Sequence, residues 1–133
     1  MAQSFKFDLV SPEKLLLSDN VDAVVIPGTD GEMTVMANHA PVMTSLRPGI
    51  VTVSRTGTAP DRFVVFGGFA DITPEACTLL AESAVRVSDI DRADLERRTL
   101  AAQEDLKDAK DPAARAKAQG VLDRYTLMHL ALA

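Results

Sequence analysis

Two histidines and one cysteine are the residues of this 133-residue chain best suited to acid–base or nucleophilic chemistry. His39 follows Glu32 by seven residues and lies between segments rich in glycine and proline. A histidine held near a carboxylate is one element of a catalytic site. His129 lies in the apolar segment LMHLALA, which predicts a packed histidine near the end of a helix.

The other parts of a catalytic site are not evident in the sequence. No serine occupies a G-x-S-x-G turn, and Cys77 lies in the apolar run ACTLLAE, which predicts a buried small residue. The spacing of Asp30, Glu32 and His39 matches no known set of metal ligands. The segments GTDGE and FGGFAD lack the glycine spacing of phosphate-binding loops. We therefore expect no catalytic residues, no cofactor and no metal.

Composition excludes further classes of function. The formal net charge is −5 and the basic residues do not cluster, so we expect no nucleic-acid binding and no electrostatic binding to anionic lipid. No window approaches 18 uninterrupted apolar residues, and the first fourteen residues lack the apolar region of a secretory leader. We therefore expect no direct membrane insertion. With one cysteine, the chain cannot form an internal disulfide.

Up to residue 87 the chain is typical of a β-sandwich domain. Glycine- and proline-rich segments separate short apolar runs of strand composition: FKFDLV, VDAVVIP, EMTVMA, IVTVSR, RFVVF, FADIT, CTLLAE and AVRVS. Short strands at this spacing indicate an antiparallel sandwich or barrel, and a parallel α/β sheet is not expected because no helical pattern falls between the runs. Among the separators, Asp30-Gly31 predicts a hairpin turn and Pro48-Gly49 another turn. Gly67-Gly68 predicts a β-bulge or a close sheet contact.

Residues 88–133 change to a helical period and predict an antiparallel two-helix hairpin. Ser88 and Asp91 are spaced as a capping box, and Asp111-Pro112 restarts a helix. Each helix carries a narrow, alanine-rich apolar stripe at 4-3-4-3 spacing. Small side chains bury little apolar area, so we expect a hairpin of marginal stability. The fold class is thus α+β, with a sandwich domain at 1–87 and a helical hairpin at 88–133.

Three segments in order resemble the epsilon subunit family of the F-type proton-translocating ATP synthase, whose mitochondrial counterpart is named delta. They are GTDGEMTVMANHAPVMTSLRPGIVTV, FVVFGGFADI and LLAESAVRVSDID. Each motif is weak singly, but the ordered set from about Phe5 to Asp91 is specific. The matching positions are Gly28, Gly31, Glu32, Asn38, His39, Ala40, Pro41, Leu46, Pro48, Gly49, Gly67, Gly68, Phe69, Ala81, Glu82 and Ala84.

The resemblance implies a non-catalytic rotor subunit of the central stalk. In the family, a sandwich of about ten strands packs on the gamma subunit and one of its ends rests on the ring of membrane c subunits. The ring-facing positions carry over to Thr29, Asp30, Gly31, Glu32 and His39. The implied location is peripheral, on the cytoplasmic side of a cell inner membrane, or on the matrix side of the mitochondrial inner membrane in a eukaryote.

The resemblance also implies a regulatory hairpin, which in many bacterial members contacts the alpha and beta subunits transiently and inhibits ATP hydrolysis. Some members bind ATP through Ile/Leu-Asp-x-x-Arg-Ala. Here the segment begins Ile90, Asp91 and Arg92, but Asp94 replaces the motif arginine and would repel phosphate. No Lys or Arg follows Arg124 in the last helix. We therefore expect weak or no ATP binding and a weak inhibitory role.

Two other interpretations remain open from the residues alone. A free-standing sandwich adaptor would use the helical arm to bind a partner and would be a stable monomer that does not associate with ATP synthase subunits. A small hydrolase would use His39 with a serine or an aspartate, and His39→Ala would abolish its turnover. The ordered motifs favour the rotor subunit over both.

Overall fold

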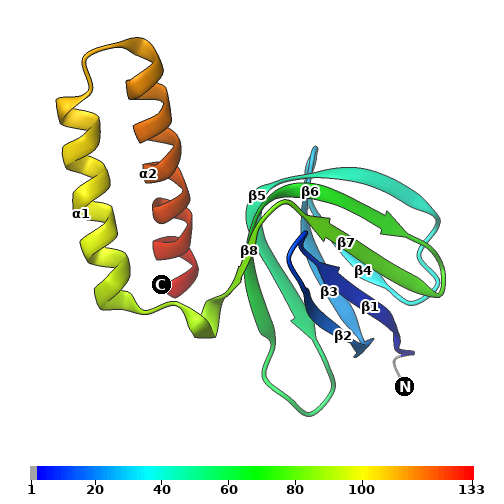
Figure 1. The fold of residues 1–133 in the computed structure, drawn as a ribbon. Coiled ribbons are helices and arrows are strands. Elements are labelled where there is room, and N and C mark those ends of the chain that lie inside the picture. The colour runs from blue at the N-terminus through cyan, green and yellow to red at the C-terminus, as the bar shows by residue number, and fades with distance from the viewer. Residues whose placement is uncertain (1–2) are drawn as a thin grey trace. The chain divides into compact units, whose positions relative to one another are not determined.

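A computed structural model of the chain describes residues 3–133. Met1 and Ala2, which the predicted 1–87 domain includes, lie outside the described residues. The chain divides into two compact units, the first ending at Arg86 and the second spanning Val87–Ala133. The first unit contains all the strands and the second contains the helices (Figure 1).

The described residues of the first unit form eight strands. Their bounds are β1 Phe5–Val10, β2 Leu15–Val21, β3 Ala23–Gly28, β4 Gly31–Met36, β5 Val42–Ser54, β6 Asp61–Ile72, β7 Ala76–Ala81 and β8 Ala84–Arg86. The strand order is β2-β1-β7-β6-β5-β3-β4, and β8 pairs with β6. The predicted α+β class, with a sandwich followed by a two-helix hairpin, is confirmed.

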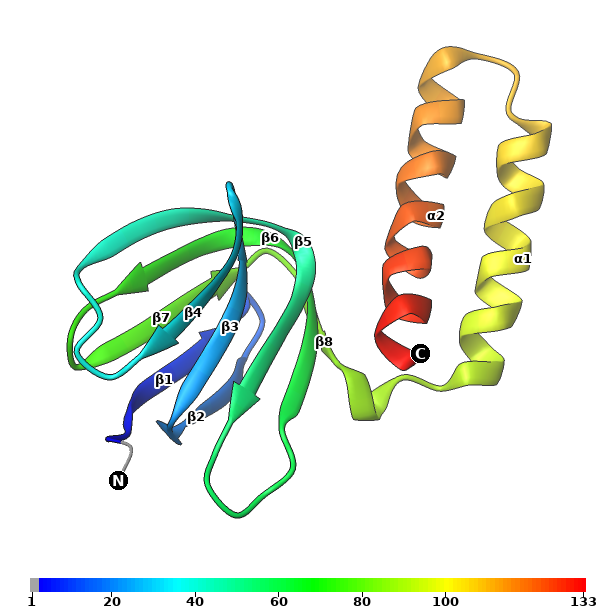
Figure 2. The same ribbon diagram turned by 180° about the vertical axis from the view of Figure 1, so that it is seen from behind.

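The sandwich has two layers because β5 and β6 are long enough to belong to both. One half of β6 pairs with β7 through residues 68–72, and the other half pairs with β8 through residues 63–65. The long strands curve from one layer to the other (Figure 2). Alternate side chains of both layers therefore meet in one core, which includes Phe7, Leu9 and Leu79 from the first layer and Ile26, Val51 and Phe63 from the second.

Three details differ from the expectations. Residues 3–133 form eight strands rather than about ten, because residues 62–66 and 69–72 belong to one strand and β5 begins already at Val42. The run at Leu15–Val21 also forms a strand that the sequence did not predict. Strands β1 and β7 pair in parallel, from Lys6 opposite Ala76 to Val10 opposite Leu80, whereas an entirely antiparallel sandwich was expected.

The predicted turn at Pro48-Gly49 is wrong, since β5 continues through both residues. Proline is tolerated there because the pairing of β3 with β5 is interrupted between Val25 and Gly28, where a missing N–H disrupts no regular ladder. Gly49 serves close packing instead, because a Cβ atom there would lie 2.6 Å from Cβ of Pro27.

Gly68 confirms the predicted close sheet contact. It lies between Leu46 of β5 and Ala81 of β7. A Cβ atom on Gly68 would lie 2.1 Å from the carbonyl oxygen of Leu80, and its φ is +137°. Only glycine fits this backbone conformation and this distance.

The second unit comprises a 3₁₀ turn at Val87–Asp89, helix α1 at Arg92–Asp108 and helix α2 at Pro112–Leu132. The predicted capping box at Ser88 is wrong, because Ser88 belongs to the 3₁₀ turn. Asp91 caps α1 instead, accepting hydrogen bonds from the backbone N–H groups of Ala93 and Asp94. Asp111 caps α2 as predicted, accepting from the N–H of Ala114 at 2.7 Å.

Candidate functional site

The first predicted contact element is the turn between β3 and β4. Gly28 pairs with Gly31, so the loop consists of Thr29 and Asp30 alone. The hydroxyl of Thr29 donates to the carbonyl of Ser45 at 3.1 Å, and Nε of Arg47 donates to the carbonyl of Gly28 at 2.9 Å. Both bonds tie the turn to β5. Asp30-Gly31 thus belongs to a hairpin as predicted, and the sandwich holds it in place.

This turn displays its polar groups outward. Thr29, Asp30 and Glu32 are exposed, and Gly31 has a φ of +130° with open space around its α-carbon. The two carboxylates and the hydroxyl of this turn can accept hydrogen bonds from polar loops of a partner.

His39 lies in a different part of the sandwich. It follows Asn38, whose backbone N–H donates to the carbonyl of Pro74 at 2.9 Å and whose side chain donates to Gln3 at 2.7 Å. Nδ1 of His39 donates to the carbonyl of Ala40 at 2.8 Å. The segment is therefore held against the turn between β6 and β7.

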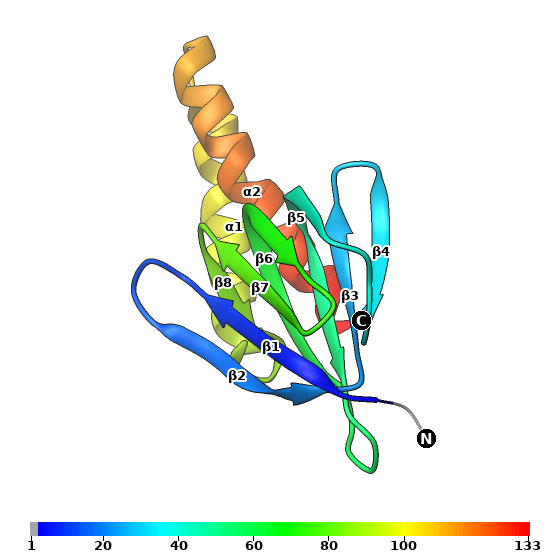
Figure 3. The same ribbon diagram turned by 90° about the vertical axis from the view of Figure 1, so that its right-hand side faces the viewer.

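The structure does not bring His39 together with the carboxylates of the β3–β4 turn. Ala23 pairs with Met36 at one end of the β3–β4 hairpin and Gly28 pairs with Gly31 at the other. The five residue steps along β4 from Gly31 to Met36 span roughly 17 Å. Figure 3 shows the β3–β4 turn at one end of the hairpin, while the chain leaves β4 toward β5 from the other. The residues thus form two separate surface elements, and His39 has no carboxylate partner from this turn.

The other candidate reactive side chains, Cys77 and His129, are buried or hydrogen-bonded within the fold. Cys77 is fully buried, and burial, together with the charge of Asp71, raises the pKa of its thiol to about 12, which keeps it protonated. Nε2 of His129 donates to the hydroxyl of Thr99 at 2.9 Å, and that hydroxyl donates to the carbonyl of Leu95. Within residues 3–133, no three His, Cys, Asp or Glu side chains are grouped so that they could hold a metal ion.

The segment that resembles an ATP-binding motif is occupied by contacts within the helical unit. Asp91 caps α1, and Nη2 of Arg92 donates to the carbonyl of Leu132 at 2.8 Å. Asp94 accepts from Arg98 at 2.8 Å and from Arg97 at 3.0 Å. These two hydrogen bonds, that from Arg98 first, lower the pKa of Asp94. The carboxylate is therefore ionised at neutral pH, where the motif has a cation.

Sequence reasoning missed an exposed apolar row on the outer face of the sandwich. Phe69 on β6 stands opposite Leu80 on β7, and Leu80 stands opposite Val10 on β1. We call these three residues the apolar row; Leu15 on β2, opposite Val10, continues it. Phe69 is 57% exposed and Leu80 53% exposed.

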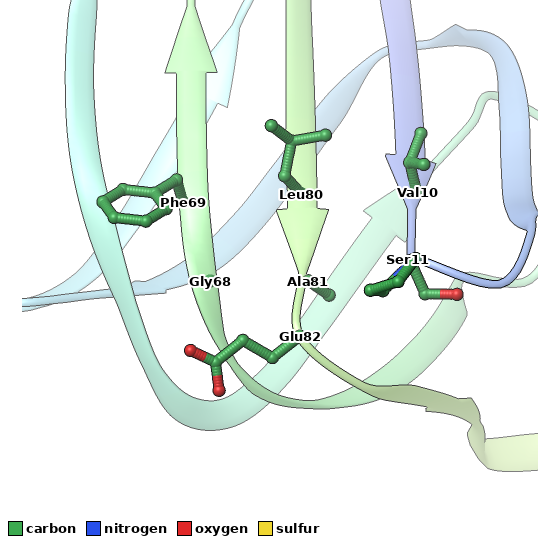
Figure 4. Close-up of a pocket in the computed structure, with 8 residues that line it drawn as sticks. Val10, Ser11, Gly68, Phe69, Leu80, Ala81 and Glu82 are labelled. Carbon is green, nitrogen blue, oxygen red and sulfur yellow. The ribbon is translucent and has the colours of Figure 1, made fainter.

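The apolar row borders a shallow hollow of about 290 Å³ (Figure 4). Glu82, just beyond the end of β7, lines the same hollow. Asp71 lies two residues after Phe69 on the same face of β6. The face is thus apolar in the middle and acidic at its edges. The run CTLLAE contained a signal for it, because two consecutive leucines in a strand must point to opposite faces.

Comparison with known proteins now identifies the group to which this sandwich and hairpin belong. The sequence model described as "ATP synthase, Delta/Epsilon chain, beta-sandwich domain" matches residues 4–87. The chain belongs to the ATP synthase delta/epsilon family. The resemblance of the three ordered motifs is thereby confirmed.

Relatives extend the match into the helices. The ATP synthase epsilon chain of Mesorhizobium japonicum is 61% identical over 132 residues, covering 99% of this chain and 98% of the relative. That of Chelativorans sp. is 58% identical over 132 residues, with the same coverage of both chains. A delta/epsilon family member is a subunit of a larger, membrane-bound ATP synthase and is not an enzyme by itself.

Solved structures share the architecture of this delta/epsilon family member. A chain in the structure of the Euglena gracilis mitochondrial ATP synthase, described as "OSCP/F1/c-ring in rotational state 1", aligns with a TM-score of 0.84 and 26% identity. The alignment covers 98% of this chain and 82% of that chain. A chain of the central stalk and c-ring of Tetrahymena thermophila ATP synthase shares the fold at a TM-score of 0.68 and 13% identity, covering 99% of this chain and 98% of that chain. Within the described residues, no helix is long and apolar enough to cross a membrane.

Proposed function

We propose that this chain is a non-catalytic rotor subunit of the central stalk, which links the gamma subunit to the c-ring and couples proton translocation to ATP synthesis. The observation that carries the proposal is the exposed apolar row on an otherwise well-packed sandwich. Val10, Phe69 and Leu80 are fixed on three neighbouring strands, so their apolar area is available to a partner at little cost in conformational entropy.

The gamma subunit is the proposed partner of the apolar row. Large aromatic and aliphatic side chains at the centre of a contact, surrounded by polar groups, are typical of protein–protein interfaces. The carboxylates of Asp71 and Glu82 border the row, and they favour a gamma surface in which lysine or arginine flanks apolar residues. A rigid sheet face bound in this way would rotate with gamma.

Binding of the full chain to purified gamma tests this proposal. Phe69→Glu places a charge in the middle of the apolar row, and we expect the affinity to fall by at least about tenfold. Met36→Glu is the matched control, because Met36 is 53% exposed and lies on β4, away from the apolar row. Wild-type affinity in Phe69→Glu, or an equal loss in Met36→Glu, would contradict the proposal.

We further propose that the β3–β4 turn, comprising Thr29, Asp30, Gly31 and Glu32, contacts the c-ring. The support is its two-residue loop, its exposed polar groups and its two hydrogen bonds to β5. Such a contact transmits position without making or breaking a covalent bond. His39 is proposed as a second, separate contact, since it follows the far end of β4 at Met36, roughly 17 Å along the strand from Gly31.

The separation of the two elements makes the c-ring proposal testable in the assembled enzyme. We expect Glu32→Lys to weaken ATP-driven proton pumping while ATP hydrolysis continues. We expect His39→Ala to act independently, so the two effects should add when the variants are combined. Unchanged pumping in both variants would refute the contacts.

The helical hairpin is proposed to contact the alpha and beta subunits only transiently and to inhibit hydrolysis weakly. No lysine or arginine follows Arg124, so the final turns of α2 offer neither to an acidic partner. We expect the assembled enzyme to hydrolyse ATP at a near wild-type rate when residues after Val87 are deleted. A many-fold activation would show that the hairpin is a strong inhibitor.

We also propose that the hairpin does not bind ATP with useful affinity. Arg92 already donates to a backbone carbonyl, and Asp94 places a negative charge where the motif has arginine. Titration calorimetry of the full chain with ATP is expected to show no saturable binding. A sub-millimolar dissociation constant would overturn this part of the proposal.

A further inference from the structure

The side-chain contacts between α1 and α2 gather at the free end of the hairpin, where α1 begins and α2 ends. The guanidinium of Arg92, the first residue of α1, donates to the carbonyl of Leu132, the last residue of α2. One turn further in, the imidazole of His129 donates to the hydroxyl of Thr99. Arg98 of α1 also lies close to the side chain of Tyr125 on α2.

Apolar burial follows the same distribution. Leu95 near the start of α1 and Ala131 near the end of α2 are buried, and Ala102 is the next buried residue along α1. Toward the turn that joins the helices there is instead a hollow of about 330 Å³. Its lining is mostly alanine and charged residues: Asp105, Asp108, Ala109, Ala114, Lys117, Ala118 and Val121.

The two ends of the hairpin are therefore held by different means. Near the loop the chain connection itself keeps the helices together, although their side chains leave a hollow. At the free end no connection exists, and closure depends on a few noncovalent contacts. Among these, the bond from Arg92 is the outermost, because it reaches the last residue of α2.

We infer that Arg92 acts as a latch that keeps the C-terminal end of α2 against α1. The last carbonyl groups of a helix have no partner within the helix and carry its negative dipole end, so a guanidinium both satisfies and neutralises them. When Arg92 is released, the last turns of α2 lose their outermost contact with α1, and they separate from α1 more often.

This inference concerns the helical unit alone and does not depend on assembly with gamma or the c-ring. It adds to the proposed function a reason why the hairpin stays closed without a bound ligand. Arg92 contributes by its hydrogen bond to the carbonyl of Leu132. Asp94 contributes by accepting from Arg98, which lies close to Tyr125 of α2. The segment that resembles an ATP-binding motif therefore holds α1 and α2 together in this chain.

Hydrogen exchange of the isolated full chain, followed by mass spectrometry, tests the latch. In Arg92→Gln we expect the amides of residues 128–132 to exchange about fivefold faster than in the wild type, with β1–β7 unchanged. Arg97→Gln is the matched control, because Arg97 is largely exposed and pairs with Asp94 on its own helix.

Arg92→Lys provides a second variant, because lysine keeps the charge and can still donate to the carbonyl. We expect its exchange rate to lie between those of the wild type and Arg92→Gln. The sandwich amides act as an internal reference for folding in every variant. Exchange at the wild-type rate in Arg92→Gln, or an equal acceleration in Arg97→Gln, would overturn the latch.

Discussion

The sandwich buries one continuous cluster of large apolar side chains, whereas the described helices bury only Leu95 and two alanines. The sandwich core draws on both layers, so each side chain is packed by several strands. The helical hairpin relies on caps, ion pairs and hydrogen bonds at its free end. Burial of apolar area stabilises a fold more strongly than exposed polar contacts do. Single substitutions should therefore have much larger effects in the first unit than in the second.

Phe7→Ala should have the largest effect of the substitutions considered. Phe7 is fully buried between the layers, and replacing a buried phenylalanine with alanine costs about 3–5 kcal/mol of the free energy of unfolding. Because the chain has no tryptophan and its one tyrosine is Tyr125 in α2, unfolding of the sandwich is best followed by amide exchange or NMR. Phe69→Ala, at an exposed position, should change stability by less than about 0.5 kcal/mol.

Gly68→Ala should come next. The new methyl group would meet the carbonyl oxygen of Leu80 and would force a positive φ on alanine, so we expect a loss of about 2–4 kcal/mol. Gly57→Ala is the control, since its φ is +82° but no atom lies within 4 Å of the added Cβ. Denaturant unfolding followed by NMR compares the two. Equal losses would mean that backbone strain, and not close contact with β7, requires glycine at position 68.

Gly120→Ala should have a smaller effect of opposite sign in the helical unit. No atom lies within 4 Å of the added Cβ, and alanine stabilises the interior of a helix by about 1 kcal/mol relative to glycine. We expect slower amide exchange in α2 and no change in the strands. Ala116→Gly, at an exposed site on the same helix, should destabilise α2 by a similar amount. A change in the sandwich amides would show that the two units are not independent in stability.

The smallest effect should appear in acid at the ion-pair network of the sandwich. Asp61 accepts hydrogen bonds from Arg55 at 2.8 Å and Arg86 at 3.0 Å, and chiefly the first of these lowers its pKa. Because the pKa of Asp61 is lower in the folded than in the unfolded state, its ionised form stabilises the fold at pH values above the unfolded pKa of about 3.9. This stabilisation is lost as the pH falls through the pKa of the folded state.

Asp61→Asn should remove that part of the pH dependence. The network is partly exposed, so we expect a difference below about 1 kcal/mol at pH 7 that disappears in acid. Unfolding by denaturant at a series of pH values measures it. A constant difference between wild type and variant across the whole range would mean that the ion pairs do not stabilise the sandwich through the charge of Asp61.

Much of the fold could be predicted from local patterns. Alternating apolar residues marked most of the strands, and Asp111-Pro112 marked the start of α2. One error arose where distant contacts override local preference. Pro48-Gly49 resembles a turn locally, but pairing with β6 and packing against Pro27 keep it in a strand. The error at Ser88 is a local one, because Ser88 lies in the 3₁₀ turn and Asp91, three residues on, caps α1.

The candidate contact residues show the same division. The sequence identified Glu32 and His39 as members of one ordered motif set, and the family is confirmed over residues 4–87. Their separation depends on the β3–β4 hairpin, which pairs Gly28 with Gly31 at the end near Glu32 and Ala23 with Met36 at the end from which the chain continues to His39. The apolar row was missed because Val10, Phe69 and Leu80 are far apart in sequence and meet only through pairing of three strands.

By itself, the sequence determined the family, the order of sandwich and hairpin, and the lack of a local catalytic motif, because these depend on residue types and spacing along the chain. Tertiary structure alone decided which side chains share a surface. Strand register set the apolar row and separated His39 from the β3–β4 turn, and helix pairing placed Arg92 against the carbonyl of Leu132. These features depend on contacts between residues distant in sequence, which local spacing does not specify.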